Sequence, residues 1–234
     1  MEYNFSSRVK SLKPSAIREI FKYSADPSYI PLSAGNPAPN AFPAEAVGEI
    51  SVALLKNAPV SVLQYSTTEG YAPLRDHLKQ YMSEKHGVGT DADGIRINSG
   101  AQQVMDMLTK SFIDAGDVVL CEAPSFIGSL NTFRSYEAKL QGIPMDADGA
   151  NLEALESALQ SQQSIKYFYT IPNFQNPSAI TMSLLKRRGV YELCKKNTVL
   201  LLEDNPYVDL RFTGEAIPCL KSLATYGILV YARS

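Results

Sequence analysis

The chain has 234 residues, of which 45% are hydrophobic and 20% are charged, and its formal net charge is −2. This size and composition are typical of one large globular domain with a few additional elements. The small negative charge gives no electrostatic basis for binding nucleic acid, and no apolar run is long enough to cross a bilayer.

The cysteines and histidines narrow the options further. Cys121, Cys194 and Cys219 are widely spaced and form no C-x-x-C motif, which favours free thiols in a reducing compartment. Two histidines, His77 and His86, are too few for a histidine-rich metal site. The first ten residues contain no apolar signal segment. We therefore expect a cytoplasmic protein without a metal centre.

The N-terminal part of the chain is expected to form an arm over residues 1–45, in front of a main domain at residues 46–234. A short helix is predicted within the arm at residues 14–21. Apolar residues at helical spacing predict two longer helices, at residues 43–57 and 73–86.

From about residue 94 the pattern becomes an alternation of short apolar runs and helical segments. The predicted strands are Ile95–Asn98, Val118–Glu122, Lys139–Ile143, Tyr167–Ile171, Val199–Glu203 and Ile228–Ala232. The predicted helices between them are at residues 101–113, 126–135, 151–161 and 181–196. Several of the strands are apolar throughout, as expected when helices cover both faces of a sheet. The sequence therefore predicts an α/β fold with a mostly parallel sheet and crossover connections.

Polar residues follow four of the apolar runs. They occur at Asn98-Ser99-Gly100, at Glu122–Ser125, at Pro172-Asn173 and at Asp204. In open α/β sheets, ligands bind beyond the carboxyl ends of the strands. We therefore expect these four segments to contribute to one shared binding site.

The segment from Ser99 to Gln103 follows a predicted strand and opens a predicted helix. The unpaired N–H groups and the dipole of a helix N-terminus favour an anion, and Gly100 permits a tight turn and a close approach to a phosphate. The alternative is an ordinary turn between strand and helix in which Ser99 caps the helix. The residues alone do not decide between the two.

Two carboxylates, Glu203 and Asp204, end a fully apolar strand. A charge in such a place is costly unless it has a partner. A carboxylate next to a pyridine nitrogen would keep that nitrogen protonated, because opposite charges favour each other's charged form. The alternative is that Asp204 caps the N-terminus of the next helix.

Two further positions have both an ordinary and a functional interpretation. Phe126, just beyond the predicted strand at 118–122, is either a core residue or a ring that stacks on an aromatic ligand. The pair Asn176-Pro177 is either a common turn or the site of a polar contact with a ligand.

Together these segments resemble the pyridoxal-phosphate (PLP) dependent aminotransferases of fold type I, class I/II, on the branch of the aminoadipate/kynurenine and aromatic aminotransferases. The resemblance extends from Arg8 to Ser234. It implies the large domain of that fold, a three-layer structure with a mostly parallel sheet, here without its last strand and without the small C-terminal domain. It also implies PLP as the cofactor. The chain departs from the family at Ala179, where a glycine usually follows the Asn-Pro-Ser/Thr segment.

The resemblance assigns roles to individual residues. The implied cofactor-binding residues are Ser99, Gly100, Ala101 and Gln102 for the phosphate, Phe126 for stacking, Asn176 and Tyr207 for the phenolic oxygen, Asp204 for the pyridine nitrogen, Ser234 for the phosphate, and Tyr65 for the phosphate in the partner subunit of a homodimer. Asp204 and Tyr207 are the implied catalytic residues. The implied substrate-binding residues are Arg18, Gly35 and Asn176.

The activity implied by the resemblance is transfer of an amino group from an aromatic or aminoadipate-like amino acid to a 2-oxo acid such as 2-oxoglutarate. In the family, the lysine that carries the cofactor lies in a Phe-Ser-Lys segment directly after the position of Ser234. The chain as written is therefore expected to be an inactive N-terminal portion. Two alternatives remain open: another fold-type I enzyme, such as a lyase or decarboxylase, and a non-catalytic PLP-binding protein or decayed fragment.

Overall fold

The computed structural model describes residues 3–10, 26, 28–30, 37–161, 164–225 and 227–234. The chain divides into two compact units. One comprises Lys13–Ala72, and the other comprises Met1–Leu12 together with Pro73–Ser234. The expected boundary between arm and main domain at residue 45 stays a prediction, and the helix expected at residues 14–21 lies outside the described residues.

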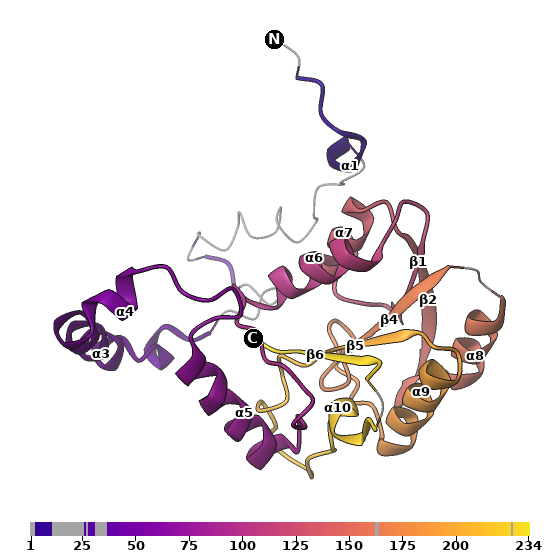
Figure 1. Cartoon of the computed structure of the whole chain (residues 1–234). Coiled ribbons are helices and arrows are strands. Elements are labelled where there is room, and N and C mark those ends of the chain that lie inside the picture. Colours follow the sequence, from indigo (N-terminus) through magenta and orange to yellow (C-terminus); the bar gives the residue numbers. More distant parts are fainter. Residues whose placement is uncertain (1–2, 11–25, 27, 31–36, 162–163, 226) are drawn as a thin grey trace. The chain divides into compact units, whose positions relative to one another are not determined.

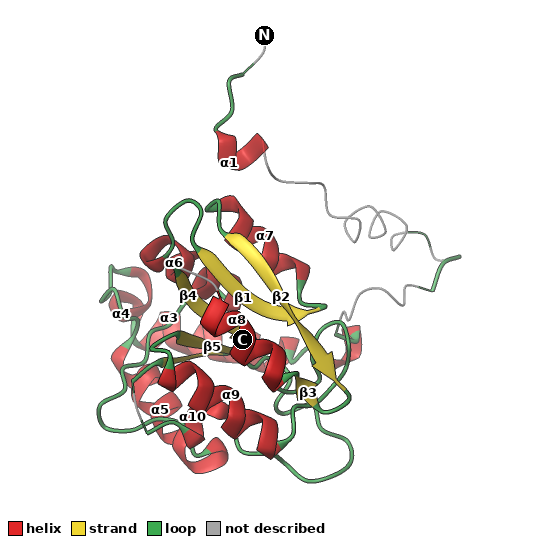
Figure 2. Ribbon diagram, turned by 90° about the vertical axis from the view of Figure 1, so that its right-hand side faces the viewer, coloured by secondary structure: helices red, strands yellow, loops and turns green. Residues whose placement is uncertain are grey.

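The larger unit contains a six-stranded sheet with strand order β3-β2-β1-β4-β5-β6 (Figure 1; β3 is labelled in Figure 2). The strands are β1 (Val118–Ala123), β2 (Lys139–Asp146), β3 (Gly149–Ala150), β4 (Ile165–Thr170), β5 (Leu200–Asp204) and β6 (Leu229–Ala232). The pairs β2–β1, β1–β4, β4–β5 and β5–β6 are all parallel, and β2–β3 is antiparallel. The predicted α/β fold with a mostly parallel sheet is therefore confirmed.

Helices cover both faces of the sheet, as Figures 1 and 2 show. The helices of the larger unit are α1 (Ser7–Lys10), α6 (Ala101–Phe112), α7 (Ile127–Ser135), α8 (Leu152–Ser161), α9 (Leu184–Lys196) and α10 (Leu220–Leu223), and α5 (Ala72–His86) begins one residue before Pro73. The smaller unit contains the 3-10 helix η2 (Pro39–Ala41) and the helices α3 (Ala44–Asn57) and α4 (Pro59–Leu63).

The alternation of side chains along each strand separates two apolar cores. On β4, Tyr167 and Tyr169 face α6 and α7, where they pack with Met105 and Phe133. Phe168 points to the opposite face and packs with α8 and α9. The sheet is thus a rigid central layer, and the loops at the carboxyl ends of its parallel strands all emerge on one edge.

One predicted strand is wrong. Residues 95–98 form no strand, although a tight turn at Ser99-Gly100 follows them as predicted. A strand needs hydrogen bonds from a neighbouring strand, and within the described part of the chain none pairs with this segment. The two-residue strand β3 was not predicted, because two residues carry no periodic pattern. The other strands and helices that were predicted within the described residues are confirmed, with ends that differ by a few residues.

Arg187 of α9 links two loops at the carboxyl edge of the sheet through hydrogen bonds. Its side chain is fully buried. The guanidinium donates to the carbonyl oxygens of Met182 at 2.9 Å, Pro172 at 3.0 Å and Pro218 at 3.0 Å. It also donates to Oδ1 of Asn173 at 2.8 Å. A guanidinium has five N–H donors in a fixed fork, so one side chain can hold several chain segments together.

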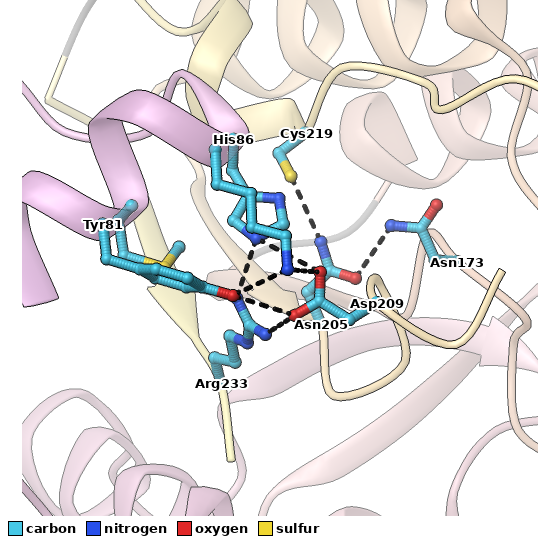
Figure 3. Close-up of polar contacts among 9 residues, drawn as sticks. Tyr81, His86, Asn173, Asn205, Asp209, Cys219 and Arg233 are labelled. Atoms are coloured by element: carbon cyan, nitrogen blue, oxygen red, sulfur yellow. Dashed lines mark hydrogen bonds and ion pairs between the residues drawn. The ribbon is translucent and has the colours of Figure 1, made fainter.

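The network continues from Asn173 to the loop that follows β5. Asn173 Nδ2 donates to Asn205 Oδ1 at 2.8 Å, and Asn205 Nδ2 donates to Cys219 Sγ at 3.4 Å (Figure 3). The buried Glu203 accepts from the backbone N–H groups of Leu220 at 3.1 Å and Lys221 at 2.8 Å. The loops after β4 and β5 are therefore linked by buried hydrogen bonds.

Replacing Arg187 tests this linkage. Arg187→Met keeps most of the side-chain volume but takes a donor from the buried carbonyl group of Met182 and from Oδ1 of the buried Asn173, so we expect a loss of about 3 kcal/mol or more in the free energy of unfolding, measured with urea. Arg188→Met is the matched control, because Arg188 is the next residue of the same helix and is exposed. The control should change the stability by less than about 0.5 kcal/mol. Equal losses in the two variants would contradict the role of Arg187.

Candidate functional site

The N-terminus of α6 lies at the first polar segment. Gly100 has φ of 79°, a conformation that favours glycine. A Cβ placed on Gly100 would meet no atom of the described part of the chain within 4 Å, so these residues leave the space in front of this turn open. The N–H groups of Ala101 and Gln102 lie in the first helical turn, where a helix offers them no acceptor. Ser99 differs, because its N–H donates to Oε1 of Gln103 at 2.6 Å. The turn can therefore accept an anion through the helix N-terminus rather than through the N–H of Ser99.

Phe126 lies directly before α7 and close to this turn. A Cβ placed on Gly128 would lie 2.6 Å from the Phe126 ring and 3.1 Å from Oε1 of Gln102. The amide Nε2 of Gln102 donates to the carbonyl of Gly128 at 3.4 Å and to Oγ1 of Thr132. The structure thus brings Gln102 and Phe126 together around Gly128, where only a residue without a side chain fits.

Asp204 is the most unusual residue of this edge. Its side chain is buried at the end of β5, and Oδ2 accepts a hydrogen bond from the Tyr169 hydroxyl at 2.7 Å. Oδ1 is also buried and has no hydrogen-bond partner among the described residues. Burial raises the pKa of Asp204 to about 6, although the hydrogen bond from Tyr169 lowers it. A buried carboxylate oxygen without a donor is costly, so Oδ1 is the atom of this site that most needs a partner.

Asn176 and Tyr207 meet at the same edge. Asn176 lies in the loop after β4 and Tyr207 in the turn after β5, and Nδ2 of Asn176 donates to the Tyr207 hydroxyl at 3.1 Å. The phenol oxygen of Tyr207 accepts this bond, so its own proton is left to donate to a further acceptor. The ring of Tyr207 packs, like Ala101 and Phe126, against the apolar cluster that contains Tyr169. The alternative role of Asp204 as a helix cap does not apply, because a turn and not a helix follows it.

The structure does not bring the remaining predicted site residues to the residues described above. Ser234 is exposed and lines a cavity of about 650 Å³ between residues 78–98 and the last strand. None of Gly100, Phe126 and Asp204 lines this cavity. Tyr65 belongs to the smaller unit, where it is 99% exposed. The two predicted substrate-binding residues Arg18 and Gly35 lie outside the described residues. Their roles stay predictions.

A cluster of charged side chains around Asp209 and Arg233 was not predicted from the sequence (Figure 3). Asp209 accepts from Lys85 at 2.9 Å and from Arg233, whose Nη1 lies 2.9 Å from Nε2 of His86. Burial raises the pKa of Asp209, but the hydrogen bond from Lys85 and the charge of Arg233 hold it below its usual value. Burial and the charge of Arg233 lower the pKa of His86. These residues come from distant segments, so no sequence pattern connects them.

Two residues that contact Asp204 directly or through one hydrogen bond were also missed. Tyr169 lies on β4 and Ser129 on α7, and both are buried. A tyrosine in an apolar strand has the pattern of a core residue, so the sequence contains no signal for its polar contact.

Among the described residues there is no group of three or more histidine, cysteine, aspartate and glutamate side chains that could hold a metal ion. No described helix has the length and apolarity that a membrane span requires.

The arrangement fits the cofactor implied by the sequence. PLP has a phosphate, a phenolic oxygen and a pyridine nitrogen, and this edge of the sheet offers a group for each. The open helix N-terminus at Gly100 suits the phosphate, and the pair Asn176–Tyr207 suits the phenolic oxygen. The unpaired Oδ1 of Asp204 suits a protonated pyridine nitrogen.

Comparison with known proteins gives a consistent result. Residues 27–234 match the family of class I and II aminotransferases. The chain is 37% identical over 234 residues to aromatic-amino-acid aminotransferase 1 of Thermococcus litoralis. The match covers 98% of this chain and 56% of that protein. Kynurenine aminotransferase of Pyrococcus horikoshii, solved in complex with PMP, has a TM-score of 0.92 and 34% identity over 98% of this chain and 58% of its own. The α-aminoadipate aminotransferase of Thermus thermophilus has a TM-score of 0.85 and 32% identity over 98% of this chain and 57% of its own.

The chain therefore belongs to the family of class I and II aminotransferases. It spans a little more than half the length of these relatives.

The raised pKa of Asp204 predicts a pH-dependent cost to stability. Because the pKa rises from 3.8 to about 6 on folding, the folded state holds the proton more tightly, and stability is lost as the pH rises through this window. The free energy of unfolding of Asp204→Asn, relative to the wild type without ligand, should therefore rise by about 2 kcal/mol between pH 4 and pH 7. Urea unfolding at several pH values measures this difference.

The exposed carboxylate of Asp91 provides the control for this experiment. Asp91→Asn should differ from the wild type by a small and nearly constant amount over the same range. A difference between Asp204→Asn and the wild type that does not change with pH would show that Asp204 carries no such cost.

Proposed function

We propose that this protein is a PLP-dependent aminotransferase that moves an amino group from an aromatic or aminoadipate-like amino acid to a 2-oxo acid such as 2-oxoglutarate. The observation that carries the proposal is the buried and unpaired Oδ1 of Asp204, three residues before Tyr207 and its partner Asn176. The names of the relatives support the class of amino donor.

The chain's own residues would hold the cofactor at three points. The helix N-terminus at Gly100-Ala101-Gln102 binds the phosphate, as favoured by the helix dipole. Phe126 lies beside Gln102 and supplies an apolar surface for the ring. Asn176 and Tyr207 donate to the phenolic oxygen. Ser99 and Ser234 are proposed as further contacts of the phosphate.

Asp204 has the central chemical role. When bound, PLP supplies a ring that withdraws electrons from the α carbon of the amino acid, and it does so best with its nitrogen protonated. Asp204 holds this proton at the nitrogen, because a buried carboxylate favours an adjacent positive charge. Tyr207 orients the ring through its hydroxyl, which Asn176 fixes at 3.1 Å.

The cellular location and the oligomeric state are also part of the proposal. A cytoplasmic location is supported by three buried cysteines with free thiols. A homodimer is supported by the family resemblance, in which Tyr65 would reach the phosphate in the partner subunit, and by the full exposure of Tyr65 in its own unit. Arg18 and Gly35 are proposed to contact the substrate. An arm at residues 1–45 and a PLP-binding domain at residues 46–234 complete the proposed organisation, and neither nucleic acid nor membrane is expected as a partner.

Product analysis tests the proposal. The protein in its natural length, supplied with PLP, an aromatic or aminoadipate-like amino acid and 2-oxoglutarate, should form glutamate and the 2-oxo acid of the donor in equal amounts. Asp204→Asn should lower kcat by about a hundredfold or more, since it removes an electrostatic partner of the reacting system. Glu215→Gln, at an exposed position, should leave kcat within about twofold.

Other outcomes point to the alternatives. Release of carbon dioxide or cleavage of the amino-acid side chain would identify a decarboxylase or lyase. Binding of PLP without any turnover would identify a non-catalytic protein.

A further inference from the structure

Tyr169 stands beside Asp204 because of the register of the sheet. In the parallel pair β4–β5, Tyr169 is opposite Leu202. Side chains alternate along a strand, so Leu202 and Asp204 share the face on which Tyr169 lies. The Tyr169 side chain extends past Leu202 toward the carboxyl end of β5, and its hydroxyl lies 2.7 Å from Oδ2 of Asp204.

Ser129 fixes the direction of this hydrogen bond. Its hydroxyl Oγ donates to the Tyr169 oxygen at 3.0 Å from α7. The Tyr169 oxygen therefore accepts one bond and gives its proton to Asp204. Ser129 is 1% exposed, Tyr169 is 0% exposed and Asp204 is 5% exposed, so water has little access to the chain Ser129–Tyr169–Asp204. A hydrogen bond to a charged group is strong in such surroundings.

We propose that Tyr169, directed by Ser129, is a positioning residue that keeps Asp204 ionised and leaves Oδ1 as the oxygen that meets the ring nitrogen of the cofactor. This role rests on the proposed function. Tyr169 touches neither substrate nor cofactor in this role, and it acts through Asp204 alone.

The chemistry of the neighbours supports the role. Burial disfavours the charged carboxylate, and the hydroxyl of Tyr169 is the group that offsets it by lowering the pKa of Asp204. The other acid near Tyr169 is Glu122, whose oxygens accept from Thr170 at 2.7 Å and from the N–H of Ile171 at 3.1 Å. Glu122 is thus occupied by its own donors. Without Tyr169, the proton would return to Asp204, and a neutral carboxyl group attracts a pyridinium only weakly.

Tyr167 provides a closely matched control. It lies two residues earlier on the same face of β4, and both tyrosines are fully buried. Both rings meet Phe133 edge-on, with centroid distances of 5.5 Å for Tyr167 and 5.3 Å for Tyr169 and interplanar angles of 75°. The hydroxyl of Tyr167, however, lies 3.0 Å from Oγ1 of Thr109 and away from Asp204. Replacing either tyrosine by phenylalanine removes the same atom from the same core.

Binding of pyridoxamine 5′-phosphate (PMP) measures the effect. PMP has the ring and phosphate of PLP and binds without a covalent bond. Its dissociation constant should be determined for the protein in its natural length between about pH 5.5 and pH 8.5, for the wild type, Tyr169→Phe, Tyr167→Phe, Ser129→Ala and Asp204→Asn. Thermal melting of each variant reports whether it is folded. Any titration of the PMP phosphate is common to all variants and does not affect their differences.

The expected result has a direction and a size. Affinity should fall on the acid side as Asp204 takes up a proton, and in Tyr169→Phe this fall should begin at a higher pH than in the wild type. At neutral pH Tyr169→Phe should bind PMP roughly tenfold more weakly, the loss expected for one hydrogen bond to a charged group. Ser129→Ala should shift the same way by less. Tyr167→Phe should stay within about twofold of the wild type.

The variants separate the two ways of failing. If the wild type does not bind PMP, or if Asp204→Asn binds it equally well, both the proposed function and the role of Tyr169 are overturned. If Asp204→Asn loses affinity but Tyr169→Phe behaves like Tyr167→Phe, the role of Tyr169 alone is wrong. If Tyr169→Phe does not fold, Ser129→Ala decides: an unchanged acid side in that variant overturns the role.

Discussion

The site depends on one buried carboxylate. Asp204 ends the apolar strand β5, which lies between β4 and β6 and where a charge is expensive, and among the described residues it has one hydrogen-bond donor, Tyr169, for its two oxygens. A protein optimised for stability alone would place an apolar residue here. The cost is explained if Oδ1 pairs with a protonated ring nitrogen. The carboxylate then lacks its second hydrogen-bond donor in the ligand-free protein and gains it when the ligand binds.

The surroundings keep this carboxylate in place. The loop with Asn176 and the turn with Tyr207 come from neighbouring strands, and the buried Arg187 and Asn173 link those loops behind the site. Asn205, the residue after Asp204, accepts from Asn173 and donates to Cys219. A site on loops is precise only when a rigid scaffold and satisfied hydrogen bonds hold the loops. The two apolar cores and the Arg187 network supply that rigidity.

The sequence predicted the fold well where the local pattern was clear. Continuous apolar runs identified the four strands β1, β4, β5 and β6, because helices cover both faces of these strands. Residues 95–98 look like a strand for the same reason, but pairing is decided by distant chain, which a local pattern does not contain. Asp204 was recognised because a charge after an apolar run is unusual. Tyr169 and Ser129 were missed because in sequence they resemble ordinary core residues. The register of β4 on β5 brings Tyr169 to Asp204, and the packing of α7 on the sheet brings Ser129 to Tyr169.

The most direct test of the account is the protonation state of the bound ring. The ¹⁵N chemical shift of PMP labelled at the ring nitrogen distinguishes a protonated from an unprotonated ring. Bound to the wild type at about pH 8, the nitrogen should be protonated, and bound to Asp204→Asn it should not be. The same unprotonated nitrogen in both proteins would contradict the central role given to the buried carboxylate.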